Sequence, residues 1–343
     1  MAMVTNDFML QLHKRLLDKT YGKENKKLSE STVSGYIKAL YMLNDKKPFK
    51  NLAFLKKKDD VEKKLEPYAE STKKTLYATI SSVLSLYKDV TTYKSIYKYF
   101  YDKMMAKAEL AGAGDTAVKT DKQSENWMDW DKVKENVLEL KNEVDKSAKQ
   151  KELGESEYNK LLNYVVLSLY TELPPRRNQD YLDMTVHRVS KTHNPKKIED
   201  LPVTSNYLLV VGNKPSKFIF NIYKTAKTYG KQVVDIPESL ASIIEMYLKR
   251  SPRKDKFLVQ RNTTVLTQGN SITRILNNIF KKKIGSSMLR HIYLSSKMNI
   301  DDMKNDANLM GHSLAEQQKY LKGETSPHEP QNPLPTSAPL EAE

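Results

Sequence analysis

The spacing of apolar residues changes along this chain of 343 residues, and that change restricts the fold more than any other feature. Over most of the sequence, apolar residues recur every three or four positions, which is the period of an amphipathic helix. Three short runs rich in Val, Ile, Phe and Tyr interrupt this pattern: NYLLVVG (206–212), KFIFNIYKT (217–225) and KQVVDIP (231–237). Such runs, separated by turn residues, predict a three-stranded antiparallel sheet. The sequence therefore predicts an α+β fold that is mainly helical and contains a small antiparallel β-sheet.

Residues 1–110 predict a separate unit of four helices. Each helix has one apolar face, and Ser29 or Ser31 is placed to cap the second helix. The four faces consist of Phe8, Leu12, Leu16; Val33, Tyr36, Ile37, Leu40, Tyr41; Leu76, Ile80, Val83, Leu84, Tyr87; and Tyr93, Ile96, Tyr97, Phe100, Met104. The unit holds 22 Lys and Arg against 13 Asp and Glu, a difference of +9. This charge is consistent with a surface that follows a phosphate backbone, or with ordinary solvated helix faces.

The rest of the chain divides into three parts. Residues 111–126 (AGAGDTAVKTDKQSEN) lose the helical period and gather small and charged residues, so they predict a linker. Residues 127–322 are predicted to be a second domain, in which helices precede and follow the three strands along the chain. Residues 323–343 contain five prolines and no Lys or Arg, so we expect a disordered tail or one that docks on a neighbouring protomer.

Composition narrows the classes of partner and chemistry. The chain has 57 Lys and Arg against 42 Asp and Glu, a net charge of +15 and a pI near 9.4, which favours a polyanion partner and nucleic acid above a membrane surface. The absence of cysteine excludes disulfides, thiolate zinc sites and cysteine nucleophiles. Because the sequence lacks both an apolar stretch of roughly 20 residues and a secretion signal, it predicts a soluble, intracellular protein.

Two segments in the first half of the predicted second domain carry basic residues suited to a phosphate. In TELPPRRNQDY (171–181) two prolines break a helix and are followed by Arg176, Arg177 and Asp180. A guanidinium group can bond two phosphate oxygens at once. The predicted hairpin then places Lys224 and Lys227 where an ammonium group could reach a leaving oxygen.

Two later segments complete the set of reactive residues. SSMLRHIYLSS (286–296) places Arg290 and His291 within an amphipathic helix. LMGHSLAEQQKY (309–320) places a histidine, His312, after a glycine and eight residues before a tyrosine, Tyr320. Arginine pairs, hairpin lysines and Gly-His turns are each common, so the argument depends on their joint order along the chain.

That order resembles the tyrosine recombinase (phage integrase) family, whose members show T-G-L-R-x-x-E, a strand-borne K-T, H-x-L-R-H and L-G-H-x…Y. The resemblance covers residues 127–322, and residues 1–110 look like the core-binding, DNA-binding domain of that family. The LPPRRNQDY form is similar to integrases of eukaryotic DNA viruses and mobile elements. The resemblance therefore implies a helical core-binding domain followed by a catalytic domain.

The resemblance implies a role for each matching basic residue. Arg177 matches the first family arginine, because Asp180 then occupies the acidic position three residues later and would orient it. Arg176 is the alternative. Lys224 matches the catalytic lysine, with Lys227 as its alternative.

The remaining matches lie in the last two segments. Arg290 matches the second arginine, His312 the histidine of the last motif, and Tyr320 the nucleophile. His291 stands beside Arg290 as in the family and takes a supporting role. Ser287 occupies the position where the family usually has His or Lys, and it could donate a hydrogen bond to phosphate.

The implied activity is cleavage and rejoining of DNA strands through a 3′-phosphotyrosyl intermediate, without metal, ATP or cofactor. The implied partner is double-stranded DNA, bound by a homotetramer on two DNA sites, in the nucleus or cytoplasm of a host cell if a virus or mobile element encodes the chain. The alternatives are relaxation of DNA by a type IB topoisomerase and a DNA-binding relative that has lost catalysis. A metal-dependent nuclease fits poorly because the six histidines show no ligand spacing with carboxylates.

Overall fold

The structure is a computed structural model that describes residues 5–21, 26–112, 119–147, 150, 152–192, 200–296, 306–313, 317 and 320. Its described part is mostly helical with a small sheet, so the predicted α+β class is confirmed. The chain divides into two compact units, residues 1–115 and 116–343. This division falls within 111–126, where a linker was predicted, although Asp121–Asn126 of that stretch forms helix α6. The predicted tail, 323–343, lies outside the described residues.

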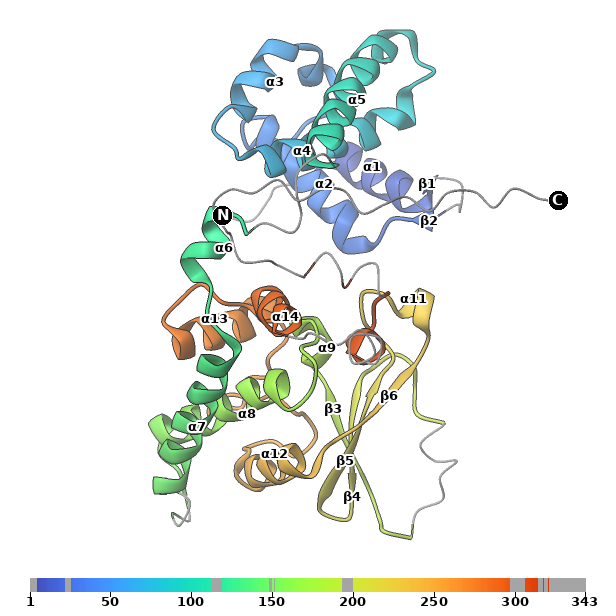
Figure 1. Ribbon diagram of the computed structural model, residues 1–343. Coiled ribbons are helices and arrows are strands. Elements are labelled where there is room, and N and C mark those ends of the chain that lie inside the picture. Colours follow the sequence, from blue (N-terminus) through green and yellow to red (C-terminus); the bar gives the residue numbers. More distant parts are fainter. Residues whose placement is uncertain are drawn as a thin grey trace, which may run out of the picture. The chain divides into compact units, whose positions relative to one another are not determined.

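The first unit has helices at all four predicted positions (Figure 1). These are α1 (Asp7–Asp18), α2 (Glu30–Leu43), α4 (Glu70–Leu84) and α5 (Thr91–Gly112), and their apolar faces form one buried core. Ser29 is the N-cap of α2, and its hydroxyl accepts a hydrogen bond from the Thr32 N–H at 3.2 Å. The short elements are β1 (Thr20–Tyr21), β2 (Lys26–Lys27), the 3₁₀ turns η1 (Ala53–Lys56) and η2 (Ser85–Tyr87), and helix α3 (Lys58–Leu65).

Helix α3 was not predicted, so the first unit has more helices than the four expected. Its sequence, KDDVEKKL, is mostly charged, and only Val61 and Leu65 mark an apolar face. Both residues are buried in the core of the unit. The helix is thus stabilised by tertiary packing of two side chains, a signal too short to register as a period in the sequence.

In the second unit most of the helices lie to one side of the sheet in the view of Figure 1. After α6 come α7 (Trp130–Ser147), α8 (Glu155–Thr171), α9 (Asn178–Tyr181), α11 (Ala226–Tyr229), α12 (Glu238–Arg250), α13 (Gly269–Phe280) and α14 (Ser286–Ser295), and residues 306–310 form a further helical segment. Helix α12 packs against both α8 and strand β5 (Lys214–Phe220). No described helix has the length and apolar character needed to cross a membrane.

The sheet is mixed, with four strands, so the prediction of a purely antiparallel three-stranded sheet was incomplete. Strands β4 (Tyr207–Val211), β5 and β6 (Gln232–Asp235) are antiparallel as predicted. The additional strand, β3 (Thr185–Val189), pairs in parallel with β4 at the edge of the sheet. Its sequence, TVHRV, contains only two apolar residues, too few to predict a strand. Pairing with the apolar strand β4 stabilises it instead.

A buried tyrosine makes the stability of the second unit sensitive to alkaline pH. Tyr181 packs edge-on against the rings of Phe218 and Phe220, and burial raises its pKa above the ordinary value of 10. The folded protein therefore keeps this proton after the unfolded chain has lost it, so stability is complete below about pH 10 and falls as the pH rises further.

We expect Tyr181→Phe to reduce this pH dependence. Within the described residues its hydroxyl makes one hydrogen bond, a long one of 3.4 Å to the Leu169 carbonyl, so the variant should match the parent protein at pH 8. Above about pH 10 the free energy of unfolding should fall more steeply with pH in the parent than in Tyr181→Phe. The difference between the two slopes should be up to about 1.4 kcal/mol per pH unit. Denaturant titrations from pH 8 to 11 measure the two slopes, and equal slopes would contradict the assignment.

Candidate active site

The first arginine of the site is Arg176, in the segment between α8 and α9. Its guanidinium group is buried, and Nε donates to Asp180 Oδ2 at 2.9 Å. Nη1 donates to Gln232 Oε1 at 2.8 Å and to the Leu309 carbonyl. Nη2 is buried and has no hydrogen-bond partner among the described residues. Arg176 is thus fixed through two of its nitrogens, while the third carries no hydrogen bond among the described residues.

Asp180 pairs with Arg176 and not with Arg177, which corrects the pairing expected from the sequence. Arg176 lies in the non-helical segment just before the N-cap residue of α9, and from there its Nε pairs with Asp180 Oδ2 on the helix at 2.9 Å. Arg177 is the N-cap residue of α9 and is half-buried; its Nη1 has no hydrogen-bond partner within the described part of the chain. The alternative given by the sequence, Arg176, is therefore the arginine that enters the buried cluster.

Asp180 is the carboxylate at the centre of this cluster and is completely buried. Burial raises the pKa of Asp180 above its usual range, and the guanidinium of Arg176 opposes that rise most strongly, followed by Arg177 and Arg290. Three cations thus act on one carboxylate. Because buried charge is costly unless it is compensated, this cluster favours a bound anion.

Arg290 is the second arginine and lies on α14. Its side chain is 6% exposed, and Nη2 donates to the Tyr320 hydroxyl at 3.4 Å. Nε and Nη1 are buried and lack a hydrogen-bond partner among the residues that the structure describes. The guanidinium carbon lies 5.0 Å from the centre of the Tyr320 ring. Arg290 therefore presents donors to an anion directly beside the predicted nucleophile.

Two histidines contact Tyr320. Nδ1 of His291 lies 2.9 Å from the backbone carbonyl oxygen of Tyr320, and the two rings are 4.9 Å apart. The ring of His312, which is buried, lies 5.7 Å from the Tyr320 ring. The structure therefore brings together Arg290, His291, His312 and Tyr320.

Gly311 sets the position of His312. Its φ of +70° lies in the left-handed region, and a Cβ atom there would stand 3.1 Å from both Gln232 Oε1 and Tyr223 Cε2. The turn closes with a hydrogen bond from the His312 N–H to the Ala307 carbonyl at 3.1 Å. Only glycine satisfies both the backbone conformation and the close packing.

The predicted lysines and Ser287 are not in contact with these residues. Lys224 lies in the turn after β5, Lys227 lies in α11, and both are exposed. Ser287 is exposed in the first turn of α14. No hydrogen bond or ion pair within the described residues joins any of the three to Arg176, Arg290 or Tyr320. The structure therefore leaves the choice between the two lysines open.

The polar residues of the β5–β6 connection that hold the site were not predicted from the sequence. Gln232 bonds Arg176, and Thr225 donates to the Gly311 carbonyl. The Tyr223 hydroxyl donates to the Gly230 carbonyl at 2.6 Å and closes the same connection. Gln, Thr and Tyr are common in hairpins, and only the fold reveals that these three meet residues 308–311.

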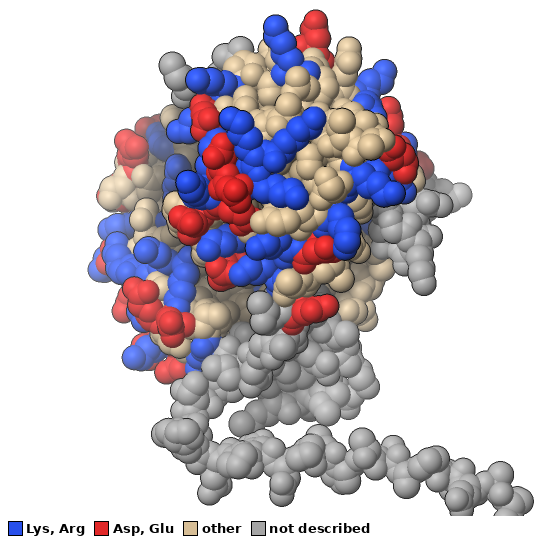
Figure 2. All heavy atoms as spheres, turned by 90° about the horizontal axis from the view of Figure 1, so that it is seen from above, with Lys and Arg blue, Asp and Glu red and all other residues tan. Residues whose placement is uncertain are grey.

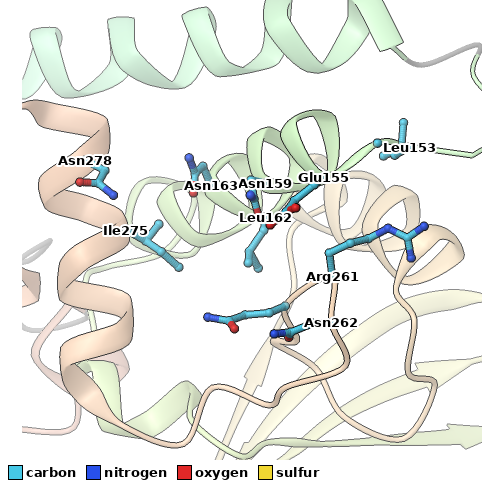
Figure 3. A pocket seen from close by; sticks show the side chains of 11 residues that line it. Leu153, Glu155, Asn159, Leu162, Asn163, Arg261, Asn262, Ile275 and Asn278 are labelled. Carbon is cyan, nitrogen blue, oxygen red and sulfur yellow. The ribbon is translucent and has the colours of Figure 1, made fainter.

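A separate hollow of about 690 Å³ lies between α8, α13 and residues 260–262. Figure 3 shows amide side chains around it, including Asn159, Asn163 and Asn278. None of the residues that the sequence analysis assigned to chemistry lines this hollow. The arginine and tyrosine cluster is therefore the better candidate for a reactive site.

Surface charge on the first unit is mixed. Figure 2 shows Lys and Arg side chains over much of the charged surface in view, with Asp and Glu between them. Several of the lysines are paired, as in the contacts of Lys64 with Asp45 and of Lys73 with Glu70. The excess of basic residues therefore does not form one uninterrupted patch on that face.

Comparisons of this chain with protein-family models, with curated proteins and with solved structures found no match. The residues of the site and their geometry are consequently the basis for assigning a function. Those residues combine buried guanidinium groups, two histidines and a half-buried phenol, a set suited to transfer of a phosphoryl group to tyrosine.

Proposed function

We propose that this protein is a tyrosine recombinase or integrase that cleaves and rejoins DNA strands through a 3′-phosphotyrosyl intermediate. The observation that carries the proposal is Arg290, whose buried Nε and Nη1 lack partners among the described residues while Nη2 bonds the Tyr320 hydroxyl. Arg176, whose buried Nη2 also lacks a partner in the described part of the chain, supplies a second guanidinium. The sequence resemblance gives these residues the chain order of the family.

In the proposed reaction, the Tyr320 oxygen attacks the phosphorus of a DNA phosphodiester. A bond forms between this oxygen and phosphorus, the bond from phosphorus to the 5′ oxygen breaks, and the 3′ phosphate stays attached to the enzyme. The 5′ hydroxyl of another strand can reverse these steps, so rejoining requires no ATP. The negative charge that gathers on the non-bridging oxygens is stabilised by Arg176 and Arg290.

Two proton transfers accompany this exchange. The phenol proton of Tyr320 passes to His312, whose ring packs beside it. The departing 5′ oxygen receives a proton from Lys224 or Lys227, which lie in the connection that also carries Thr225 and its bond to Gly311. His291 holds the Tyr320 backbone at its carbonyl and acts as a positioning residue.

Double-stranded DNA is the proposed partner, bound by a homotetramer on two DNA sites. The net charge of +15 supports a polyanion partner, since phosphate contacts supply most of the affinity of DNA-binding proteins. The resemblance alone supports the tetramer. In this proposal the first unit is the core-binding domain, and the second carries the chemistry.

Capture of covalent adducts tests the proposal. The protein is incubated in EDTA with a library of short nicked duplexes, and SDS-resistant adducts are isolated and sequenced. Adducts on one recurrent sequence, with the DNA attached to the peptide containing Tyr320, are the expected result. Adducts on nearly any sequence would instead indicate a type IB topoisomerase, and binding without adducts would indicate a non-catalytic relative.

A further inference from the structure

We propose that Gln232 is a positioning residue that couples the orientation of Arg176 to the turn leading to His312, an inference that rests on the proposed function. Gln232 is the first residue of β6. Its Oε1 accepts from Arg176 Nη1 at 2.8 Å, and its Nε2 donates to the Asn308 carbonyl at 2.9 Å. One amide group therefore joins a strand, a catalytic guanidinium and the turn.

The bond to Gln232 helps to decide which nitrogens of Arg176 a phosphate can reach. Asp180 occupies Nε, while Gln232 and the Leu309 carbonyl occupy Nη1. Nη2 is left without a partner among the described residues. With Nε and Nη1 both occupied, the planar group cannot rotate about its axis without breaking hydrogen bonds, so Nη2 points in one direction.

The same amide supports the turn that carries His312. The Asn308 carbonyl accepts from Gln232 and also from the Gly311 N–H at 3.1 Å. The absent Cβ of Gly311 leaves room for Gln232 Oε1, which would stand only 3.1 Å from such an atom. A displacement of the amide would therefore disturb both Arg176 and the turn.

Gln232→Met tests this role, because methionine has similar length and volume but makes neither hydrogen bond. Gln179→Met on α9, where the glutamine is exposed, is the matched control. We expect single-turnover formation of the Tyr320 adduct to slow about 10- to 100-fold in Gln232→Met, a loss typical of a reacting group displaced by roughly 1 Å. The affinity for DNA should change less than about threefold, because phosphate contacts over the whole site determine it.

Amide hydrogen exchange supplies a readout that does not need activity. In Gln232→Met the amides of Gly311 and His312 should exchange about tenfold faster, while those of α12 keep their rates. Unchanged exchange together with unchanged adduct formation would overturn the coupling. If the parent protein forms no adduct, the proposed function fails, and faster exchange at Gly311 and His312 would still support the coupling of Gln232 to the turn.

Discussion

Replacement of Tyr320 by phenylalanine is expected to abolish covalent attachment to DNA while leaving the fold and DNA binding intact. Among the described residues the hydroxyl has one hydrogen bond, a long one of 3.4 Å from Arg290 Nη2, so its removal costs little stability. Because Tyr320 is the nucleophile of the proposed reaction, the rate of adduct formation should fall by more than about 10⁴-fold. Gel analysis of SDS-resistant adducts measures the rate, and thermal denaturation checks the fold.

Tyr229→Phe is the control for that substitution. Tyr229 is exposed on α11 in the same unit. The Tyr229→Phe variant should therefore form adducts at the parental rate. Persistent adducts in Tyr320→Phe, mapped to another tyrosine, would show that the assigned nucleophile is incorrect. Loss of DNA binding in the same variant would instead assign Tyr320 to recognition.

The sequence predicted much of the fold because most elements have a strong apolar period. Helices α2 and α5 place buried residues such as Val33, Ile37 and Phe100 at helical spacing, and β4 is almost entirely apolar. Two of the elements it missed, α3 and β3, have few apolar residues and are stabilised by neighbours far along the chain. Such tertiary support cannot be read from a local period.

The site was predictable only as a set of residue types in order. The motif placed Asp180 three residues after Arg177, but Arg176, which precedes the helix, is the arginine that pairs with Asp180. The bonds from Arg176 to Gln232 and Leu309 join residues distant in sequence, and no local pattern marks them. Residue type identified both arginines as candidates, but only the contacts of the folded chain distinguish Arg176 from Arg177.

Replacement of Arg290 by methionine is expected to separate catalysis from stability. Loss of one preorganised donor beside the reacting phosphate should slow adduct formation about 10²- to 10³-fold. Methionine fills a similar volume without charge, so the variant removes the guanidinium whose Nε and Nη1 have no partners among the described residues. Single-turnover cleavage of a nicked duplex measures the rate, with Arg274→Met on the exposed face of α13 as control.

The stability of Arg290→Met should equal or exceed that of the parent, because a buried cation without a full set of partners costs folding free energy that an apolar side chain does not, often about 1–4 kcal/mol. Inorganic phosphate should raise the Tm of the parent by binding the folded state, and this rise should be smaller in the variant. If Arg290→Met instead lost about 3 kcal/mol or more, as when a buried ion pair is broken, Arg290 would be a structural residue. If Arg290 has the proposed role, its replacement should lower the rate of adduct formation without lowering the free energy of unfolding.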